Sequence, residues 1–297
     1  MRPAANTSIR QKIDGSAHGH LRWIALSVVL FACIPRGAVA QTPSPLQEWQ
    51  YPGGITLFKL FQPQVPKWSA VLGAAVETAP RYDGALAYHV QVGPVIDIRF
   101  RDIAFLSVGE GLGVNIVRGR NYRAGIAIGY DLGRKVEDYP THLRGLGDIP
   151  KAPVIKLFGS YAISKRFPLV LRVDVRKIAG GAGGLVGDIE AFMPLPGSSE
   201  RLIMLAGPSV TFADLSHMQK TFGISGIQAL ASGYPNYAAH GGLNTVGLGF
   251  SATRFLSHHV LVTADAALNH LMGSARDSPI TQSSVQGVLA LSAAYRW

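Results

Sequence analysis

The sequence is poor in cysteine and in charge. One of its 297 residues is a cysteine and 15% are charged, whereas 47% are hydrophobic and 34 are glycine. Globular proteins usually carry about a quarter charged residues, and disordered chains combine high charge with few apolar residues. The composition therefore disfavours disorder. It also fits poorly with a helical soluble enzyme, because glycine recurs inside the apolar segments.

Two further absences narrow the classes of function. The sequence contains neither Gly-x-Ser-x-Gly nor His-Glu-x-x-His, the local signatures of serine hydrolases and zinc proteases. This absence is mild evidence against an enzyme. The formal charge is +10, but the basic residues stand singly along the chain. Because a nucleic-acid-binding surface would be a clustered basic patch, we predict no nucleic-acid partner.

Long hydrophobic runs are missing too, apart from one near the N-terminus. A basic leader precedes the apolar stretch Trp23–Ile34 and the small-residue site Ala38–Ala40. Such a charged region, short apolar core and small-x-small site form a secretory signal. We predict a signal peptide over residues 1–40, cleaved after Ala40, with lipoprotein processing at Cys33 as the minor alternative. The mature chain would then lack cysteine and any apolar run of about 20 residues, the length of a membrane helix.

The rest of the sequence divides into a proline-rich segment and a patterned segment. Residues 41–66 contain Thr42-Pro-Ser-Pro45 and Gln62-Pro-Gln-Val-Pro66, which predict a periplasmic tail or linker. Residues 67–297 consist of alternating segments of about ten residues, separated by turn signals. Alternation of apolar and polar residues with a period of two predicts β-strands.

The stretch Pro168–Lys177 shows why these strands are expected to form a membrane barrel. Its leucines and valines alternate with Arg172, Asp174 and Arg176. In a soluble sandwich the apolar face would turn to a core, whereas in an outer-membrane barrel it faces lipid and the charges face the lumen. Here the polar faces mix glycine and serine with isolated charges of both signs, which is unlike a soluble surface.

Aromatic residues support the barrel, because they lie at the ends of the apolar faces as in an interfacial girdle. They are Trp68, Phe100, Tyr122, Tyr130, Tyr161, Tyr295 and Trp297. We predict an all-β protein, a transmembrane antiparallel up-and-down β-barrel formed by residues 67–297. The apolar residues Leu289, Leu291, Tyr295 and Trp297 of the last strand resemble the C-terminal assembly signal of such barrels.

Connection lengths set the predicted number of strands. Barrels have short turns on the periplasmic side and longer loops outside. The long connections are 271–283, 213–241 and 133–151. To keep long and short connections alternating, Ile103–Val117 has to split into two short strands around Glu110-Gly111. This split gives twelve strands, whereas a single strand there would leave ten or eleven together with a piece of 53–61.

Charged residues on the polar faces are the candidate lumen residues. They are Arg99, Arg123, Arg172, Asp174, Arg176, Asp188, Glu190 and Asp265. These side chains could line a conduit for solutes. We favour the simpler interpretation, a network of ion pairs that fills the lumen. A twelve-stranded barrel lies between the filled eight-stranded and the open sixteen-stranded types.

Two fragments look like ligand sites and are better explained as turns. The glycines of Gly180–Gly184 would need a following helix to cradle a phosphate, and strands flank them instead. His258-His259 lies in a predicted turn without the third ligand that zinc sites need. We therefore predict no catalytic, metal or cofactor site.

Six short motifs lie in or beside the predicted loops. They are Pro80–Gly84, Leu143–Ile149, Gly180–Val186, Ala213–Ile224, Ser232–Leu243 and Asp277–Ile280. In order and spacing together, these motifs resemble the MipA/OmpV family of outer-membrane proteins from about Trp68 to Trp297. The long basic leader and the proline-rich residues 41–66 depart from the family pattern.

The resemblance implies an exported β-barrel in the outer membrane of a Gram-negative cell, surrounded by lipid and lipopolysaccharide. The family's founding member is described as a scaffold that brings a lytic murein transglycosylase to a penicillin-binding protein, and other members as porin-like or adhesive. We therefore expect a non-enzymatic scaffold with these two kinds of enzyme as partners. The alternative is a narrow porin-like channel for small solutes.

The expected docking face of the scaffold is periplasmic. It would consist of the tail 41–66 together with basic residues of the short turns. These residues are Arg101, Arg118, Arg120, Lys165 and Arg166. The resemblance supplies no catalytic residue, metal ligand or cofactor.

Overall fold

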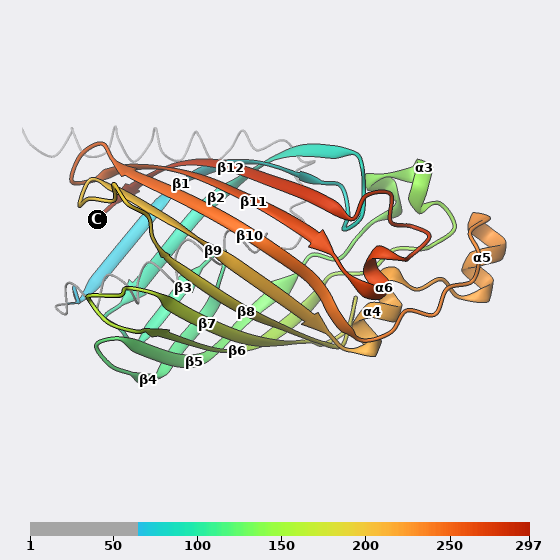
Figure 1. Ribbon diagram of the computed structural model, residues 1–297, viewed down its shortest axis with the longest axis horizontal. Helices are drawn as coiled ribbons and strands as arrows, with labels where there is room; N and C mark the ends of the chain where they lie inside the picture. Colours follow the sequence, from blue (N-terminus) through green and yellow to red (C-terminus); the bar gives the residue numbers. More distant parts are fainter. Residues whose placement is uncertain (1–64) are drawn as a thin grey trace, which may run out of the picture. The chain divides into compact units, whose positions relative to one another are not determined.

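The computed structural model describes residues 65–297. The predicted signal peptide, its cleavage site after Ala40 and most of the predicted tail 41–66 lie outside this range. Residues 68–296 form a closed barrel in which each strand pairs antiparallel with the next and β1 pairs with β12 (Figure 1). The predicted fold, a twelve-stranded antiparallel β-barrel, is confirmed.

In chain order the strands are β1 (Trp68–Pro80), β2 (Tyr88–Phe100), β3 (Ala104–Ser107), β4 (Gly111–Arg118), β5 (Tyr122–Asp131), β6 (Ala152–Ala162), β7 (Val170–Ile178), β8 (Leu185–Pro194), β9 (Leu202–Ala213), β10 (Gly242–Phe255), β11 (Val260–Leu271) and β12 (Val285–Arg296). The predicted split of Ile103–Val117 is correct, because β3 and β4 are separate strands joined by a turn at 108–110.

Closure joins the first strand to the last in a fixed register. Thr78 pairs with Leu289 and Leu72 pairs with Tyr295. The backbone N–H of Trp297 donates to the carbonyl of Ala70 at 2.9 Å, so the ladder continues to the final residue. A closed ladder leaves no sheet edge along this seam, which is what a strand surrounded by lipid requires.

The two faces of the strands differ as the alternation predicts. On β7, Val173 is 48% exposed, whereas its neighbour Arg172 is 2% exposed. The same contrast holds on β12, where Leu289 and Leu291 are exposed and Ala290, Ser292 and Ala294 are buried. The outer face is therefore the apolar one, and the polar side chains turn into the barrel. None of the helices among residues 65–297 is long and apolar enough to cross a membrane.

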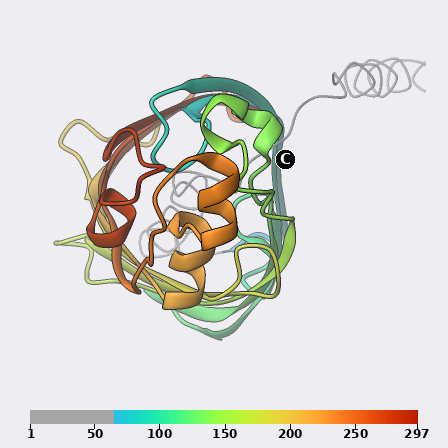
Figure 2. The same ribbon diagram turned by 90° about the vertical axis from the view of Figure 1, so that its right-hand side faces the viewer.

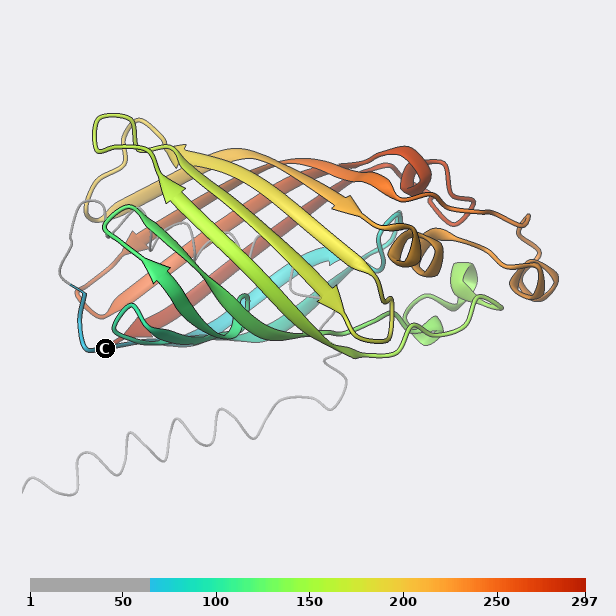
Figure 3. The ribbon, with the colours of Figure 1, turned by 90° about the horizontal axis from the view of Figure 1, so that it is seen from below.

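The two ends of the barrel carry different connections. At one end five short turns join the strands, at 101–103, 119–121, 163–169, 195–201 and 256–259. At the other end lie the longer connections 81–87, 132–151, 179–184, 214–241 and 272–284. Figure 3 shows the short turns at its left and the longer connections with their helices at its right. We call these the short-turn end and the long-loop end.

Short helices occur within the long connections. They are η1 (Val136–Asp138), α3 (Pro140–Leu143), α4 (Leu215–Phe222), α5 (Gly226–Ser232) and α6 (Gly273–Arg276). Asp214 caps α4 by accepting a hydrogen bond from the backbone of His217, and Ser225 caps α5 in the same way from Gln228. Such side-chain caps satisfy amides that have no partner inside the first helical turn.

Candidate functional sites in the lumen and at the two ends

Inside the barrel, the β3–β4 turn brings one carboxylate to two arginines. Glu110 is 3% exposed. Its Oε2 accepts a hydrogen bond from Arg99 Nη2 at 2.6 Å, and its Oε1 accepts one from Arg123 Nη2 at 2.7 Å. Arg99 also pairs with Asp97 through Nε at 2.7 Å. Pairing within this group offsets much of the cost of burying its charges.

A second group of lumen charges joins β7 to β8. Arg172 lies 3.2 Å from a carboxylate oxygen of Asp174 and 3.2 Å from one of Glu190. Arg176 pairs with Asp188 through Nη2, and its Nε is 3.6 Å from Asp174. The charges alternate in sign along β7, and both charges of β8 are acidic, so each arginine contacts two carboxylates.

Asp265 lies apart from both groups. It is buried on β11, in register with Ser251 of β10 and Ala290 of β12. Glu77 of β1, also buried, pairs with Ala290 from the other side. Two buried carboxylates therefore flank the same residue of β12. This wall of the lumen is acidic, whereas the wall formed by β7 and β8 carries both signs.

Aromatic side chains fill the lumen next to the first charge group. Phe105 and Phe158 are buried, with ring centroids 5.6 Å apart. The guanidinium of Arg123 lies 5.9 Å from the first ring and 5.3 Å from the second. Arg99 lies 5.2 Å from Phe105. Cations over aromatic faces are attracted to the ring quadrupole, so this part of the lumen is packed with mutually favourable contacts.

The eight lumen charges predicted from the sequence all have buried or half-buried side chains, and seven of them lie in these two groups. That they fill the lumen, and do not line a conduit, stays a prediction. Sequence reasoning missed Glu110, which it assigned to a turn. A signal was available, because Glu110 lies in a tight turn between strands that carry Arg99 and Arg123 on their polar faces.

At the long-loop end, the connections pack against one another over the mouth of the barrel (Figure 2). We call this layer the cap. Its apolar core includes Met218 and Phe222 of α4, Leu143 of α3 and Ile280 before β12, all buried. Figure 2 shows α4 and α5 crossing in front of the barrel. The loop 213–241 therefore lies in front of part of the mouth, a placement that the sequence did not determine.

Polar contacts tie the connections of the cap together. The hydroxyl of Tyr82 donates to the carbonyl of Ile280 at 2.8 Å, and that of Ser278 donates to Phe222 at 2.6 Å. Burial raises the pKa of Tyr82 to about 12 and lowers the pKa of His217 below its ordinary value. Each bond links connections far apart in the sequence, so the cap is one packed unit.

The short-turn end is strongly basic. Nine lysines and arginines lie in or beside its turns, against two carboxylates, Asp102 and Glu200. The basic residues are Lys67, Arg101, Arg118, Arg120, Lys165, Arg166, Arg201, Arg254 and Arg296. All but the last are exposed. Within residues 65–297, no ion pair joins any of the nine to a carboxylate. We call this surface the basic rim.

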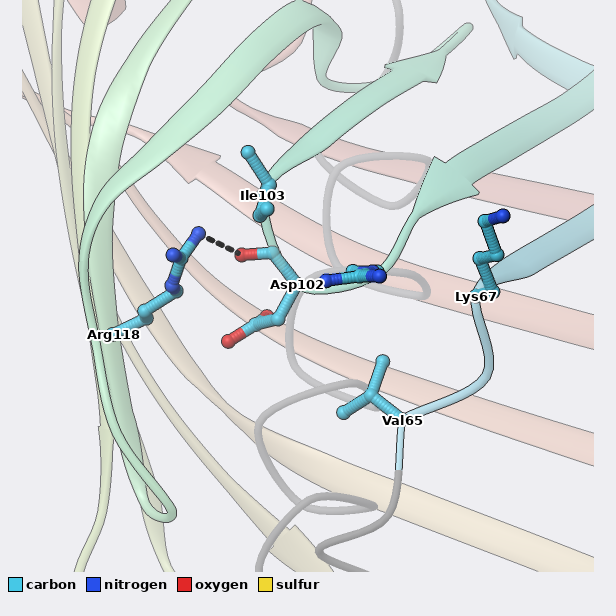
Figure 4. Close-up of a pocket in the computed structure, with 6 residues that line it drawn as sticks. Val65, Lys67, Asp102, Ile103 and Arg118 are labelled. Carbon is cyan, nitrogen blue, oxygen red and sulfur yellow. Dashed lines mark hydrogen bonds between the residues drawn. The ribbon is translucent and has the colours of Figure 1, made fainter.

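An open pocket of about 500 Å³ lies in the basic rim between the start of β1 and the β2–β3 turn. Lys67, Arg101 and Arg118 line it together with Asp102. Figure 4 shows Arg118 reaching toward the carbonyl of Asp102, which accepts its Nη1 at 3.5 Å. Nδ2 of Asn115 donates to the same carbonyl at 3.1 Å. Three cations and one carboxylate thus line the pocket, whose excess of positive charge is complementary to an anion.

The fragments that sequence reasoning explained as turns lie in turns. Gly180, Gly181, Gly183 and Gly184 all have positive φ between β7 and β8, which explains why glycine is needed there. His258-His259 lies in the β10–β11 turn, where the ring of His259 stacks on Tyr295. Among the described residues, no group of three or more His, Cys, Asp or Glu could hold a metal ion.

The last strand presents its apolar residues on the outer surface. Leu289, Leu291, Tyr295 and Trp297 are all exposed there. Tyr295 and Trp297 lie at the short-turn end with ring centroids 4.5 Å apart. Their predicted role as an assembly signal remains a prediction.

Comparison with known proteins gives one family and several barrels. The family model described as "MltA-interacting protein MipA" matches residues 72–297. No curated protein matches the chain. Among solved structures, OmpT of Vibrio cholerae is 9% identical and covers 79% of this chain and 100% of its own, with a TM-score of 0.36. The CymD monoaromatic hydrocarbon channel is 8% identical and covers 88% and 98%, with a TM-score of 0.40.

Proposed function

Because the chain belongs to the MltA-interacting protein (MipA) family, we propose that it is a non-enzymatic outer-membrane scaffold that docks murein-remodelling enzymes at its basic rim. The family's description names an interaction with MltA, and for this chain a lytic murein transglycosylase is the proposed partner, with a penicillin-binding protein as the second. Short turns of outer-membrane barrels face the periplasm, which is where such enzymes work. Residues 1–40 would direct export, and the tail 41–66 would adjoin the rim.

The observation that carries the proposal is the unpaired charge of the basic rim. Nine basic residues face two carboxylates there, and eight of the nine are exposed. Clustered charge of one sign repels itself and steers a partner of the opposite sign toward the surface. A barrel whose role was confined to the lumen would have no need of such a rim. The rim therefore supports docking of an acidic protein surface from the periplasm.

The lumen supports the scaffold over the channel. Its two charge groups are paired internally, and Phe105 and Phe158 pack against the first group. The cap lies over the other end of the same lumen. Charged side chains that pair with one another in this way are typical of a filled barrel rather than of an aqueous pore. A narrow porin-like channel is kept as the alternative that the experiment below decides.

The test reverses the charge of the rim at exposed residues in and beside its turns. In the rim variant, Arg101, Arg118, Lys165 and Arg166 are each replaced by Glu. Binding of a purified lytic murein transglycosylase to the detergent-solubilised full chain is then measured at low and high salt. We expect wild-type binding to weaken as salt rises, because exposed charges are screened. The rim variant should bind several-fold more weakly at low salt and lose the salt dependence.

A control carries the same kind of charge reversal at two positions of the opposite end. Arg144 and Lys151 are exposed in the long connection between β5 and β6, and their replacement by Glu should leave binding unchanged. Wild-type affinity in the rim variant would contradict docking at the rim. Stepwise ionic conductance of the purified barrel in planar bilayers, together with unchanged enzyme capture, would favour the channel instead.

A further inference from the structure

The barrel wall extends least far toward the long-loop end where the short strands β3 and β4 lie. β3 pairs with β2 only from Asp97 to Phe100, and the N–H of Val108 closes the ladder on the carbonyl of Ile96 at 3.0 Å. Beyond that point, β2 continues to Tyr88 and pairs with β1 alone among the described strands. The barrel therefore has a gap in strand pairing above the β3–β4 turn, which we call the notch.

The other flank of the notch is the upper part of β5. β4 pairs with β5 as far as Ile128, and β5 continues to Asp131 paired with β6 alone. Tyr88 and Tyr130 stand on the outer face near the upper ends of β2 and β5, and both are exposed. Exposed tyrosines at strand ends mark the membrane interface. Since the β3–β4 turn lies farther down the wall, the notch opens toward the hydrocarbon of the outer leaflet.

The edge of β2 is shaped against pairing with another strand. Because the carbonyl of Ile96 points to β3, the backbone groups of the even-numbered residues before it point into the notch. One of these residues is Pro94, which has no N–H to donate. A proline on an edge strand blocks the addition of a further strand. The edge groups of Val90 and Val92 still require polar partners, because lipid supplies none.

The lumen side of the notch has space and free polar atoms. A Cβ added to Gly93 of β2 or to Gly129 of β5 would meet no described atom within 4 Å. Next to Gly93, Gln91 donates its Nε2 to Glu77 at 2.9 Å, which leaves its Oε1 buried without a hydrogen-bond partner. Nδ1 of His89 is buried without a partner too. Buried polar atoms of this kind normally bind water or a ligand.

We propose that the notch is a lateral portal at which a membrane amphiphile binds, with its uncharged hydroxyl or amide head group in the lumen and its acyl chain in the outer leaflet. The head group would meet Gln91, His89 and the free backbone groups of β2. These partners are neutral, and the charges below the notch are already paired through Glu110. The chain would lie against Val90 and Val92, which are exposed on the outer face.

The first experiment measures binding directly. The full chain in lipid nanodiscs is titrated with deuterated monopalmitoylglycerol, and the bound probe is counted by native mass spectrometry. We expect saturable binding of one molecule to each barrel. Gly93→Trp should fill the lumen-side space and weaken binding about tenfold, the loss of one well-made polar contact. The control Gly187→Trp places the same side chain on the lipid-facing side of β8 and should bind as wild type.

Three outcomes would overturn the portal or its head-group specificity. Absence of saturable binding to the wild type would remove the site, and unchanged binding by Gly93→Trp would place it elsewhere. Equal binding of hexadecane would show that the head group is not recognised.

A second measurement tests the opening without any ligand. In a Cys33→Ser background, a nitroxide label is attached to Gly93→Cys or to Ser292→Cys. Both positions face the lumen in the same row of the sheet, because Ala75 pairs with each of them. At each position we compare relaxation of the label by oxygen, which concentrates in lipid, with relaxation by a water-soluble nickel chelate. The ratio of oxygen to nickel relaxation should be higher at 93 than at 292. Equal accessibility at the two positions would mean that the wall is closed and the proposal is wrong.

Discussion

The two ends of the barrel both carry many charged residues, but these residues make different contacts. The long connections carry seven basic and six acidic residues, and the basic rim carries nine basic and two acidic residues. In the cap, Arg81 donates to the carbonyl of Asp138 at 2.6 Å and Arg134 donates to that of Thr221 at 3.0 Å. In the rim, none of the nine cations forms an ion pair with a carboxylate of residues 65–297, although Arg118 and Arg296 each donate to a backbone carbonyl. The cap therefore uses its charges on itself, whereas the rim leaves them for a partner.

The cap should therefore contribute mainly to stability, and the rim mainly to recognition of a partner. A packed unit with a core around Phe222 gains free energy from burial, so substitutions there should be felt as loss of structure. An exposed cationic surface contributes little to folding, so substitutions there should be felt as loss of binding. Each prediction below tests one side of this contrast, beginning with the largest expected effect.

The largest effect is expected in the core of the cap. Phe222→Ala removes a fully buried ring from α4 and should cost about 3–5 kcal/mol of cap stability, the usual range for such a cavity. Leu230→Ala, at a side chain 92% exposed in α5, is the matched control and should change little. Hydrogen exchange of the α4 amides measures both. Equal protection in the two variants would show that the cap is not a packed unit.

The wall between the two ends gives the next largest effect. Val173→Arg places a charge on the outer face of β7 and should cost about 2–4 kcal/mol if the position lies near the middle of the bilayer. The control Ile227→Arg makes the same kind of change at an exposed residue of the cap, outside the membrane, and should cost almost nothing. Urea unfolding from lipid vesicles compares the two. A cap variant that is as unstable as the wall variant would contradict the assignment of the lipid-facing surface.

The barrel could be predicted from the sequence because the alternation of apolar and polar residues within each strand identifies its two faces. The alternation around Arg172 is local, and so is the splitting of Ile103–Val117 by Glu110-Gly111. The partner of a lumen charge is not local, because it depends on register across strands. Asp188 and Arg176 illustrate this, since they contact one another from different strands. Glu110 was assigned to a turn because sequence spacing does not show that a turn residue points inward.

The cap was beyond sequence reasoning for a related reason. Its core joins Tyr82, Leu143, Phe222 and Ile280 from four different connections. No periodic pattern links residues so far apart, and the helices are too short to show an amphipathic repeat. The rim was partly foreseen, because basic residues in short turns can be read directly. Lys67, Arg201, Arg254 and Arg296 belong to the rim as well, because the bounds of the strands place them at the same end of the barrel.

A smaller effect should distinguish the cap from the rim by pH. Burial lowers the pKa of His217, whose ordinary value is 6.5. Protonation of His217 therefore favours the unfolded cap. The stability that neutral His217 gives the cap is fully present above pH 6.5, and it is lost as the pH falls through the lower pKa of the folded state. After correction for intrinsic rates, α4 amides should exchange faster at about pH 5 than at about pH 7.5. His217→Gln should remove the difference, and its persistence in that variant would implicate another group.

The smallest effect on folding is expected at the basic rim. Arg166 is exposed in the β6–β7 turn, and within residues 65–297 no hydrogen bond or ion pair involves its side chain. Arg166→Glu should therefore change the free energy of unfolding by no more than about 0.5 kcal/mol, as is usual for surface positions without structural contacts. Arg81→Glu, made at the opposite end, removes the bond to Asp138 and should loosen the cap measurably more. Urea midpoints and hydrogen exchange near η1 are measured for both variants. If the rim variant proved the less stable of the two, the rim would be part of the folded core, and its charge could no longer be taken as available to a partner.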